Sequence, residues 1–270
     1  MRLTKEQIDE YNEKGFLVFP DLLSQEEVDI ARLEIERIAV ADTDHVIREK
    51  SGSARTIFRT HDDESPTYSK PYYAMARAPR LLDPVRDVLG SDALYMHHSK
   101  LNLKDAIDGA VWQWHQDYGY WKRDGVPSPD GMTTVLVMLN EATEMGGCLY
   151  FIPGSHKLGR LDPELDDSTT SYKLWVVPKK EVLQIMDDLG DPVPIVGKPG
   201  TAVMFHPNLV HGSGHNMSRY SRWHMYFVYN DLANKAEEVE EPRPEYVCSR
   251  AFKPIERMDD SAVLMAGSAD

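Results

Sequence analysis

The sequence predicts a mainly β protein, a jelly roll that is buttressed by helices lying before it in the chain. From about residue 93 onward, short alternating or apolar runs follow one another, separated by turn residues, as in a β-sandwich or barrel. The first 92 residues carry helix-start motifs and helical apolar spacing instead. About eight short strands with flanking helices favour a jelly roll, and no internal repeat is visible.

The N-terminal 92 residues are predicted to form the helical buttress and the first strand. A Thr-x-x-Gln capping box at 4–7 opens a short helix, and the apolar run 16–19 follows it as a strand. A second capping box at 24–27 opens the most amphipathic helix of the chain. Residues 42–66 are polar and fit no regular element, whereas 71–90 read as a helix that a proline interrupts.

The rest of the chain is predicted to hold the β core, 93–230, and a charged tail, 231–270, so that 1–270 form a single domain. The predicted strands are 93–103, 111–117, 132–139, 148–152, 172–177, 193–196, 201–205 and 222–230. A helix at 179–188 interrupts them. The loop 122–132 is rich in glycine and proline, and it is either a lid over a pocket or a plain connector.

Composition excludes several classes of function. A formal charge of −14 argues against nucleic acid and anionic membranes as partners, because both need clustered Lys and Arg. The chain shows neither the apolar run of a signal peptide nor a membrane-spanning segment. Its two cysteines, Cys148 and Cys248, form no disulfide framework, so a reducing compartment, the cytoplasm, is expected.

The segment Trp114-His115-Gln116-Asp117 is the first candidate for chemistry. In a strand, residues i and i+2 point to the same face, so His115 and Asp117 are expected to hold one metal ion between them. Two histidines and one carboxylate form the facial triad of non-haem Fe(II) oxygenases. A plain hydrogen-bonded His–Asp pair is the alternative. Spacing alone leaves three candidates for the second histidine: His206, His211 and His215.

Four motifs in a fixed order resemble the phytanoyl-CoA dioxygenase family. They are Trp114-His115-x-Asp117, the run Gly147-Cys148-Leu149-x-x-Ile152-Pro153-Gly154-Ser155-His156-Lys157, His211-Gly212-Ser213, and Arg222 eleven residues past His211. The likeness extends from about residue 8 through Tyr229. The stretch 95–102 and Trp121 bring the chain nearest to the bacterial branch that acts on small substrates and includes ectoine hydroxylase, although His98 stands where that enzyme has a substrate-binding glutamine.

The resemblance implies a cupin-like double-stranded β-helix core, with Fe(II) as cofactor and 2-oxoglutarate and O2 as co-substrates. It implies His115, Asp117 and His211 as catalytic iron ligands. Arg222 would bind the remote carboxylate of 2-oxoglutarate, for which its guanidinium offers two parallel hydrogen bonds. The other residues assigned to the co-substrate are Ser213, Asn102, Trp121 and Phe205.

Four residues are candidates for contact with the substrate: His98, Lys100, Tyr118 and Tyr226. His98, Lys100 and Asn102 alternate along one predicted strand and therefore share a face. If that face lines the barrel, it forms a pocket for a small polar or charged metabolite. A solvent-facing surface is the alternative.

The expected reaction is hydroxylation of a small polar metabolite, such as an amino acid, a compatible solute or a natural-product intermediate, with release of succinate and CO2. Asp117 argues against halogenation, because the related halogenases lack this carboxylate. The alternatives are desaturation or ring formation at the same iron, or a cupin-type metalloenzyme that does not use 2-oxoglutarate.

Overall fold

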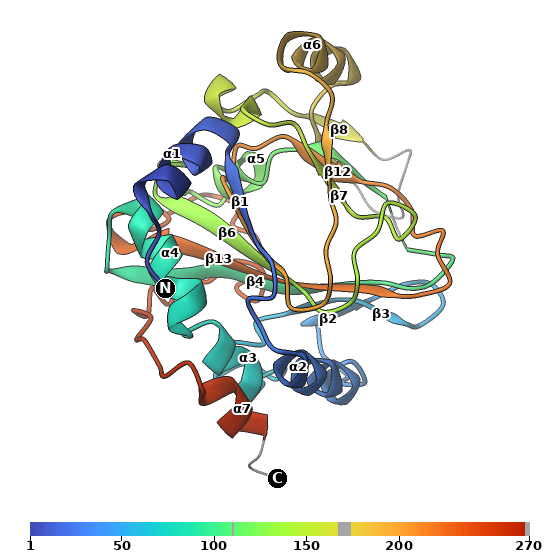
Figure 1. Ribbon diagram of the computed structural model, residues 1–270, viewed down its shortest axis with the longest axis vertical. Coiled ribbons are helices and arrows are strands. Elements are labelled where there is room, and N and C mark those ends of the chain that lie inside the picture. The colour runs from blue at the N-terminus through green and yellow to red at the C-terminus, as the bar shows by residue number, and fades with distance from the viewer. Residues whose placement is uncertain (110, 167–173, 268–270) are drawn as a thin grey trace.

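The computed structural model describes residues 1–109, 111–166 and 174–267. Within them, a seven-stranded antiparallel sheet in the order β1-β11-β6-β13-β4-β3-β2 lies opposite a four-stranded sheet in the order β10-β7-β12-β5 (Figure 1). Side chains from both sheets form a common apolar cluster between them. The jelly roll that the sequence predicts is therefore confirmed.

The strands and helices have the following bounds. The large sheet consists of β1 (Phe16–Phe19), β2 (Val46–Arg48), β3 (Ala54–Phe58), β4 (Leu94–Lys104), β6 (Met132–Met138), β11 (Ala202–Phe205) and β13 (Arg222–Asp231). The small sheet consists of β5 (Trp112–His115), β7 (Leu149–Phe151), β10 (Val193–Ile195) and β12 (His211–Ser213), while β8 (Glu164–Asp166) pairs with β9 (Leu174–Val176). The helices are α1 (Lys5–Lys14), α2 (Gln25–Ile38), α3 (Lys70–Met75), α4 (Pro79–Leu89), α5 (Tyr118–Trp121), α6 (Lys179–Leu189) and α7 (Ala262–Gly267). Single 3₁₀ turns occupy η1 (Ser155–Leu158) and η2 (Leu232–Asn234).

The large sheet is buried on both faces. In β6, Val135 and Val137 join the apolar cluster that includes residues of α2, α3 and α4, whereas Leu136 and Met138 join the cluster between the two sheets. This is why residues 135–138 of β6 form a continuous apolar run and not an alternating one. The helices therefore cover the outer face of the large sheet (Figure 1), and the inner face is left for the site.

Helix starts follow the sequence closely. Thr4 and Gln7 form the expected reciprocal capping box, as do Ser24 and Glu27. The predicted helix 71–90 is two helices, α3 and α4, and the second begins at Pro79, where a missing N–H costs no hydrogen bond. Across the described residues, none of the helices has the length and apolar character needed to span a bilayer.

The predicted strands differ from the structure at several places, and β8 was not predicted. Residues 42–66 are not irregular throughout, because β2 and β3 lie within them and extend the large sheet. The predicted strand 111–117 ends at His115, and one helical turn, α5, follows it. The strand β12 was not predicted at all. Residues 172 and 173 of the predicted strand 172–177 lie outside the described part of the chain.

The C-terminal segment returns to the β core. Beyond Phe58 the strand β3 no longer pairs with β4, and the C-terminal segment takes the place beside β4 that β3 leaves. The amide of Ser249 donates to the carbonyl of His97 at 2.8 Å, and the amide of Ile255 donates to the carbonyl of Leu94 at 2.8 Å. The segment ends in α7, which lies beside α3 and α2 (Figure 1).

Candidate active site

The small sheet brings two histidines together. His115 ends β5 and His211 begins β12, and the two residues are directly opposite in the antiparallel register. Their ring centroids are 4.2 Å apart. The carboxylate of Asp117 completes the group, with its Oδ1 3.8 Å from Nε2 of His115. One ligand atom from each of the three residues lies within 4.8 Å of the other two, which fits a single metal ion.

Both imidazoles are oriented for metal binding. Nδ1 of His115 donates to the carbonyl of Gln113 at 2.6 Å, and Nδ1 of His211 donates to the carbonyl of Leu209 at 2.9 Å. A hydrogen bond of this kind fixes the tautomer and leaves Nε2 with a free lone pair. The donor set therefore fits Fe(II) without rearrangement of either ring.

Asp117 reaches the site by a route that differs from the predicted one. Its backbone is helical, with φ −59° and ψ −37°, because Asp117 precedes the helix α5 and does not continue the strand. The amide of Tyr118 donates to the carbonyl of Pro207 at 3.0 Å, which ties this turn to the loop before β12. The sequence therefore predicted correctly that His115 and Asp117 lie close together. The predicted reason, alternation along one strand, was wrong.

Burial sets the protonation of the ligands. It lowers the pKa of His115 to about 3, and the neighbouring His211 acts in the same direction. Burial alone would raise the pKa of Asp117, but His211 and Lys100 outweigh it and hold that pKa below its ordinary value. His115 and Asp117 are thus unprotonated at neutral pH, as metal binding requires.

A small recess adjoins the three ligands. Its volume is about 20 Å³, and its lining includes Asn102 and Ser213 together with the ligands themselves. Phe205, also assigned to the co-substrate, lies in the apolar cluster with its ring centroid 5.3 Å from that of His211. Trp121 lies elsewhere, in the wall of the larger cavity.

Arg222 lies near this recess as a buried cation. Its side chain is fully buried, and its Nη1 contacts Nδ1 of His224 at 2.6 Å, while Nε has no hydrogen-bond partner. Burial lowers the pKa of Arg222, and burial followed by the charge of Arg222 holds the pKa of His224 well below its ordinary value. No Asp or Glu of the described residues forms an ion pair with Arg222. The guanidinium of Arg222 therefore has N–H groups that can donate hydrogen bonds to a bound anion.

A second buried basic residue, Lys104, was missed by sequence reasoning. Its Nζ contacts Oγ of Ser213 at 2.9 Å and donates to the carbonyl of Gly214 at 2.5 Å. Burial, with help from the charge of Arg222, lowers the pKa of Lys104 to about 6. The signal was available, because the inward alternation of His98, Lys100 and Asn102 along β4 continues to residue 104.

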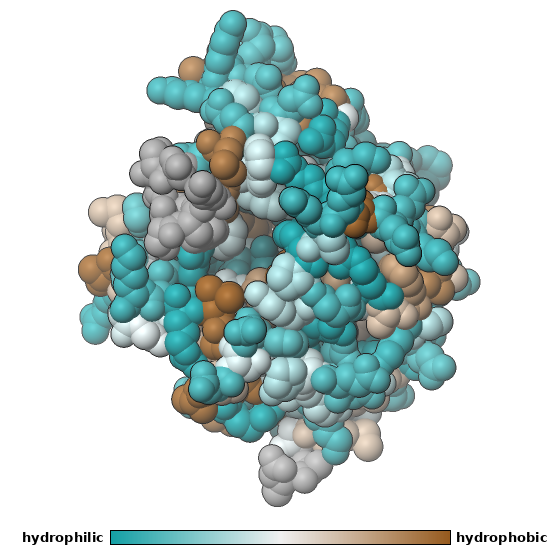
Figure 2. All heavy atoms as spheres, turned by 180° about the vertical axis from the view of Figure 1, so that it is seen from behind, coloured by the Kyte–Doolittle hydropathy of each residue, from teal (hydrophilic) through white to brown (hydrophobic). Residues whose placement is uncertain are grey.

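The larger cavity adjoins the same ligands and has a volume of about 380 Å³. His98, Lys100 and Tyr226 line it, as the sequence predicted. Tyr118 does not. Its hydroxyl donates to the carbonyls of Val126 and Pro127, and its ring packs in a separate apolar cluster. Tyr120 lines the cavity instead, because the helical turn α5 brings residues 120 and 121 to the side of Asp117. Figure 2 shows a largely hydrophilic face of the molecule, hollowed near its centre.

Comparisons with known proteins agree with this geometry. The family profile "Phytanoyl-CoA dioxygenase (PhyH)" matches residues 11–223. The chain is 32% identical to the ectoine dioxygenase of Bordetella bronchiseptica, over 95% of this chain and 86% of that protein. It is 31% identical to the L-proline trans-4-hydroxylase of Streptomyces griseoviridis, over 92% of this chain and 94% of that protein.

A solved structure shares the fold. EctD from S. alaskensis, in a crystal structure with 2-oxoglutarate and 5-hydroxyectoine, superposes with a TM-score of 0.81 and 28% identity, over 95% of this chain and 88% of that chain. The same protein has also been crystallised with bound Fe. With the facial set of two histidines and one carboxylate on the page, these likenesses identify the chain: it belongs to the phytanoyl-CoA dioxygenase family of Fe(II)- and 2-oxoglutarate-dependent dioxygenases.

Proposed function

We propose that the protein hydroxylates a small, carboxylate-bearing metabolite, with 2-oxoglutarate as the co-substrate and His115, Asp117 and His211 as the iron ligands. One observation carries the co-substrate assignment. Arg222 and Lys104 are both buried near the metal group, and neither has an acidic partner among the described residues. A dicarboxylate supplies the negative charge that the Arg222 guanidinium lacks, and its charge would favour the protonated form of Lys104.

Two residues that line the recess, Asn102 and Ser213, and two buried basic residues near it then have a part in holding the co-substrate. The Arg222 guanidinium binds the remote carboxylate, Lys104 keeps Ser213 turned toward that carboxylate, and Asn102 borders the same space. Bound Fe(II) supplies the activation of O2 that is coupled to decarboxylation of 2-oxoglutarate to succinate. The protein excludes water from this reaction, with the aromatic rings of Trp121 and Tyr226 in the cavity wall.

Lys100 supports the choice of a carboxylate-bearing substrate. Its ammonium lies 5.0 Å from the ring centroid of Trp112 and 5.5 Å from that of Tyr226, in the wall shared by the cavity and the recess. Burial lowers its pKa, whereas the charge of Asp117 raises it. An anionic group on the substrate would pair with this cation beside the iron. Ectoine and L-proline, named for two relatives, are small molecules of this type.

We also propose the cytoplasm as the compartment of this reaction. Both cysteines, Cys148 and Cys248, are free thiols and are buried. Such thiols suit a reducing environment.

Succinate release tests the proposed function. Protein reconstituted anaerobically with Fe(II) and 2-oxoglutarate is expected to form succinate slowly once O2 is admitted, and His115→Ala or Asp117→Ala is expected to abolish this. Equal turnover in the variants would contradict the ligand assignment. Turnover that does not need 2-oxoglutarate would favour the cupin-type alternative.

A second measurement addresses the substrate. A panel of amino acids and compatible solutes that begins with L-proline and ectoine is added, and stimulated succinate release is recorded. Each stimulating acid is then compared with its amide, for example L-prolinamide beside L-proline. We expect the amide to lose the stimulation, and Lys100→Met to raise the KM for the acid. An acid and amide of equal activity would contradict recognition of a carboxylate.

A further inference from the structure

Lys104 holds its amine among oxygen atoms that carry no formal charge. Its Nζ lies 2.5 Å from the carbonyl oxygen of Gly214, 2.9 Å from Oγ of Ser213 and 3.5 Å from the carbonyl oxygen of Gly147. Only 2% of the residue is exposed, and no Asp or Glu of the described residues forms an ion pair with it. The fold therefore buries a base without an acid to balance its charge.

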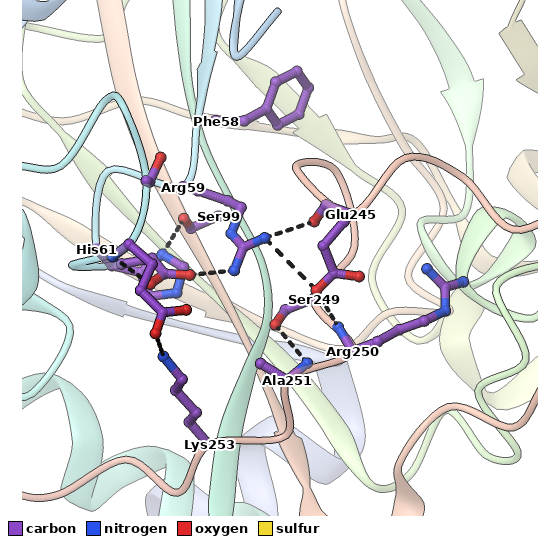
Figure 3. Close-up of polar contacts among 12 residues, drawn as sticks. Phe58, Arg59, His61, Ser99, Glu245, Ser249, Arg250, Ala251 and Lys253 are labelled. Atoms are coloured by element: carbon purple, nitrogen blue, oxygen red, sulfur yellow. Dashed lines mark hydrogen bonds and ion pairs between the residues drawn. The ribbon is translucent and has the colours of Figure 1, made fainter.

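A basic side chain elsewhere in the fold shows the contrast. The side chain of Arg59 is 12% exposed, and it forms ion pairs with Asp62 and Glu245. Figure 3 shows its guanidinium directed toward Glu245, whose Oε1 lies 3.6 Å from Nη1. The charge that acts most strongly on Lys104 is instead the like charge of Arg222, which lies opposite it where β13 pairs with β4. The lack of an acidic partner is therefore a property of this site.

The three oxygen atoms around Nζ differ in the hydrogen bonds they can form. A carbonyl oxygen only accepts, so Gly214 and Gly147 each require an N–H group of Lys104, whereas the Ser213 hydroxyl can accept or donate. An ammonium has three N–H groups and no lone pair, while a neutral amine has two N–H groups and one lone pair. The charged form therefore donates to all three oxygens. The neutral form donates to the two carbonyls and accepts the hydrogen of Ser213.

The protonation state of Lys104 thus decides where the hydroxyl hydrogen of Ser213 points. When Lys104 is charged, Oγ accepts from it, and the hydroxyl hydrogen is free to donate to an anion in the recess that Ser213 lines. When Lys104 is neutral, its lone pair takes that hydrogen, and Ser213 presents only oxygen lone pairs to the recess. A carboxylate there favours the charged form, through both its charge and the hydrogen bond that it gains.

Close packing keeps the lysine in place when its charge changes. Gly147 has φ +69°, and a Cβ added to it would lie 2.7 Å from the carbonyl oxygen of Gly214, so the two loops that supply the carbonyls are in tight contact. A Cβ added to Gly109 would lie 2.8 Å from Cβ of Lys104, which confines the stem of the side chain. A change of protonation is therefore expressed in the Ser213 hydroxyl and not in a movement of Lys104.

Several titratable or charged groups lie around Lys104 and set its charge. They are Arg55 of β3, Cys148 ahead of β7, His215 after β12, and Arg222 and His224 of β13. Burial, followed by the charges of Arg222 and Arg55, lowers the pKa of Lys104 to about 6. Burial also keeps Cys148 and His224 uncharged, because it raises the pKa of the thiol and lowers that of the ring. In the ligand-free protein the amine is therefore neutral at pH 7.5.

We propose that Lys104 is a positioning residue that takes up a proton from solvent as 2-oxoglutarate binds, and that it thereby turns the hydroxyl of Ser213 toward the bound carboxylate. This inference rests on the proposed function, because it assumes that the recess holds the remote carboxylate. The proton passes from water or buffer to the lone pair of Nζ. The Ser213 hydrogen then leaves its hydrogen bond to Nζ for one to a carboxylate oxygen. Binding of the dianion is thus coupled to the gain of a proton.

Calorimetry counts this proton. 2-Oxoglutarate is titrated under argon into Fe(II)-loaded protein at pH 7.5, in MOPS and in Tris, because the heats of ionisation of these buffers differ. Bound iron prevents proton uptake by its histidine ligands. We expect wild-type protein to take up about one proton for each 2-oxoglutarate bound, and Lys104→Met to take up none. Lys180→Met is the matched control, since Lys180 is an exposed lysine of α6 and its loss should leave the uptake unchanged.

The pH dependence of the affinity gives the direction of the coupling. A lower pH supplies the proton that binding requires, so we expect the Kd for 2-oxoglutarate to be roughly fivefold lower, or more, at pH 6.5 than at pH 8.0. Lys104→Met should lose this dependence. Lys104→Arg carries a permanent charge, so it should bind without proton uptake and with a Kd that does not vary over this range.

A double-mutant cycle tests the action of Lys104 on Ser213. Lys104→Met and Ser213→Ala should each raise the Kd for 2-oxoglutarate. Because the lysine acts in part through the hydroxyl, the double variant should raise the Kd by less than the product of the two separate effects. A purely structural role of Lys104 would raise the Kd without changing the number of protons taken up.

The outcomes separate the inference from the proposed function. Binding of 2-oxoglutarate by wild-type protein without proton uptake would overturn the inference, as would uptake that persists in Lys104→Met. Effects that multiply in the cycle would overturn the positioning of Ser213. If Lys104→Met does not fold, the wild-type proton count and Lys104→Arg decide. Wild-type protein that neither binds 2-oxoglutarate nor forms succinate would contradict the proposed function itself.

Discussion

Arg222 is a buried charge that the folded chain leaves uncompensated. A guanidinium removed from water loses several kcal/mol of hydration unless a counter-charge replaces it. Its contacts in the protein include the phenol of Tyr226 and the neutral ring of His224, whose pKa burial and Arg222 together lower. Such an arrangement lowers the stability of the ligand-free protein, and binding of an anion restores it. Arg222 therefore links the stability of the protein to its co-substrate.

Replacing Arg222 with Met should separate binding from stability. We expect Arg222→Met to raise the KM for 2-oxoglutarate by at least tenfold, because removal of one partner of a buried charge pair costs about 2–5 kcal/mol. The ligand-free variant should unfold at the same or a higher temperature than wild type. Thermal unfolding with and without 2-oxoglutarate, in iron-loaded protein under argon, measures both effects.

Arg222→Lys is the companion to this variant. It keeps the charge but loses the planar fork that grips a carboxylate at two points, so an intermediate KM is expected. A wild-type KM in Arg222→Met would contradict the assignment of this residue to the co-substrate.

Single residues of the site could be predicted from the sequence where they belong to a recognisable motif. His115, Asp117, His211 and Arg222 stand at the spacings that the family resemblance implies, and the structure brings the first three together. Lys104 was not predicted, because no short motif contains it and only the alternation along β4 points to it. Tyr118 was misplaced: it is the first residue of α5 and packs in a separate apolar cluster, whereas Tyr120, one helical turn after Asp117, lines the cavity.

Among the elements, β12 has a position that leaves little room for a larger side chain. It lies between β5 and β7, and its three residues include His211, the proposed iron ligand, and Ser213, which is proposed to contact the co-substrate. Between them, Gly212 lies against β5. A Cβ added at Gly212 would lie 3.1 Å from the carbonyl oxygen of Trp112 and 3.3 Å from the amide nitrogen of Trp114. These are backbone atoms of the strand that ends in His115, so they move only with the strand.

Gly212→Ala should therefore weaken iron binding more than it weakens the fold. Overpacking of this kind typically costs about 1–3 kcal/mol, and here the strain is relieved by separating β12 from β5. We expect at least a tenfold higher Kd for Fe(II), measured anaerobically by competition with a chelator. Gly214→Ala is the matched control, since an added Cβ there meets no atom within 4 Å. Equal iron affinity in both variants would show that β12 tolerates the change.

Elements were predictable where one sequence period dominates. The capping boxes gave the starts of α1 and α2, and the apolar run gave β6. The strands β2 and β3 were missed because their residues are mixed in polarity, and only pairing with β4 makes them strands. The same holds for the C-terminal segment, whose hydrogen bonds to β4 join residues far apart in sequence. Contacts between residues so far apart along the chain leave no pattern in the local sequence.

On the scale of the whole molecule, charge is distributed unevenly. The chain carries a formal charge of −14, yet the larger cavity is lined by Arg48, Arg55, Lys100 and Arg243. Asp117, an iron ligand, is the one acidic residue among the described residues that line it. A positive cavity with low-dielectric walls concentrates the field and attracts an anion through an otherwise acidic surface. The overall charge of the chain therefore does not describe the cavity, which presents basic side chains to a small molecule.

The buried histidines give the whole fold a dependence on pH. Burial lowers the pKa of His61 to about 3, and burial together with the neighbouring His156 lowers that of His206 to about 4. In an unfolded chain a histidine has a pKa of about 6.5. As the pH falls from 6.5 toward these values, the unfolded state takes up protons that the folded state does not, so stability declines.

Urea unfolding of the iron-free protein at pH 7.5 and pH 5.0 measures this decline. Between pH 6.5 and pH 5.0, each such site costs up to about 2 kcal/mol, at about 1.4 kcal/mol for each pH unit. His61→Gln removes one site, so its stability should fall less over the same interval, even though it loses the 2.6 Å contact of His61 with Ser99 at both pH values. A decline equal to that of wild type would mean that His61 is protonated in the fold, and the Ser99 hydroxyl would then have to accept a hydrogen bond from a charged ring.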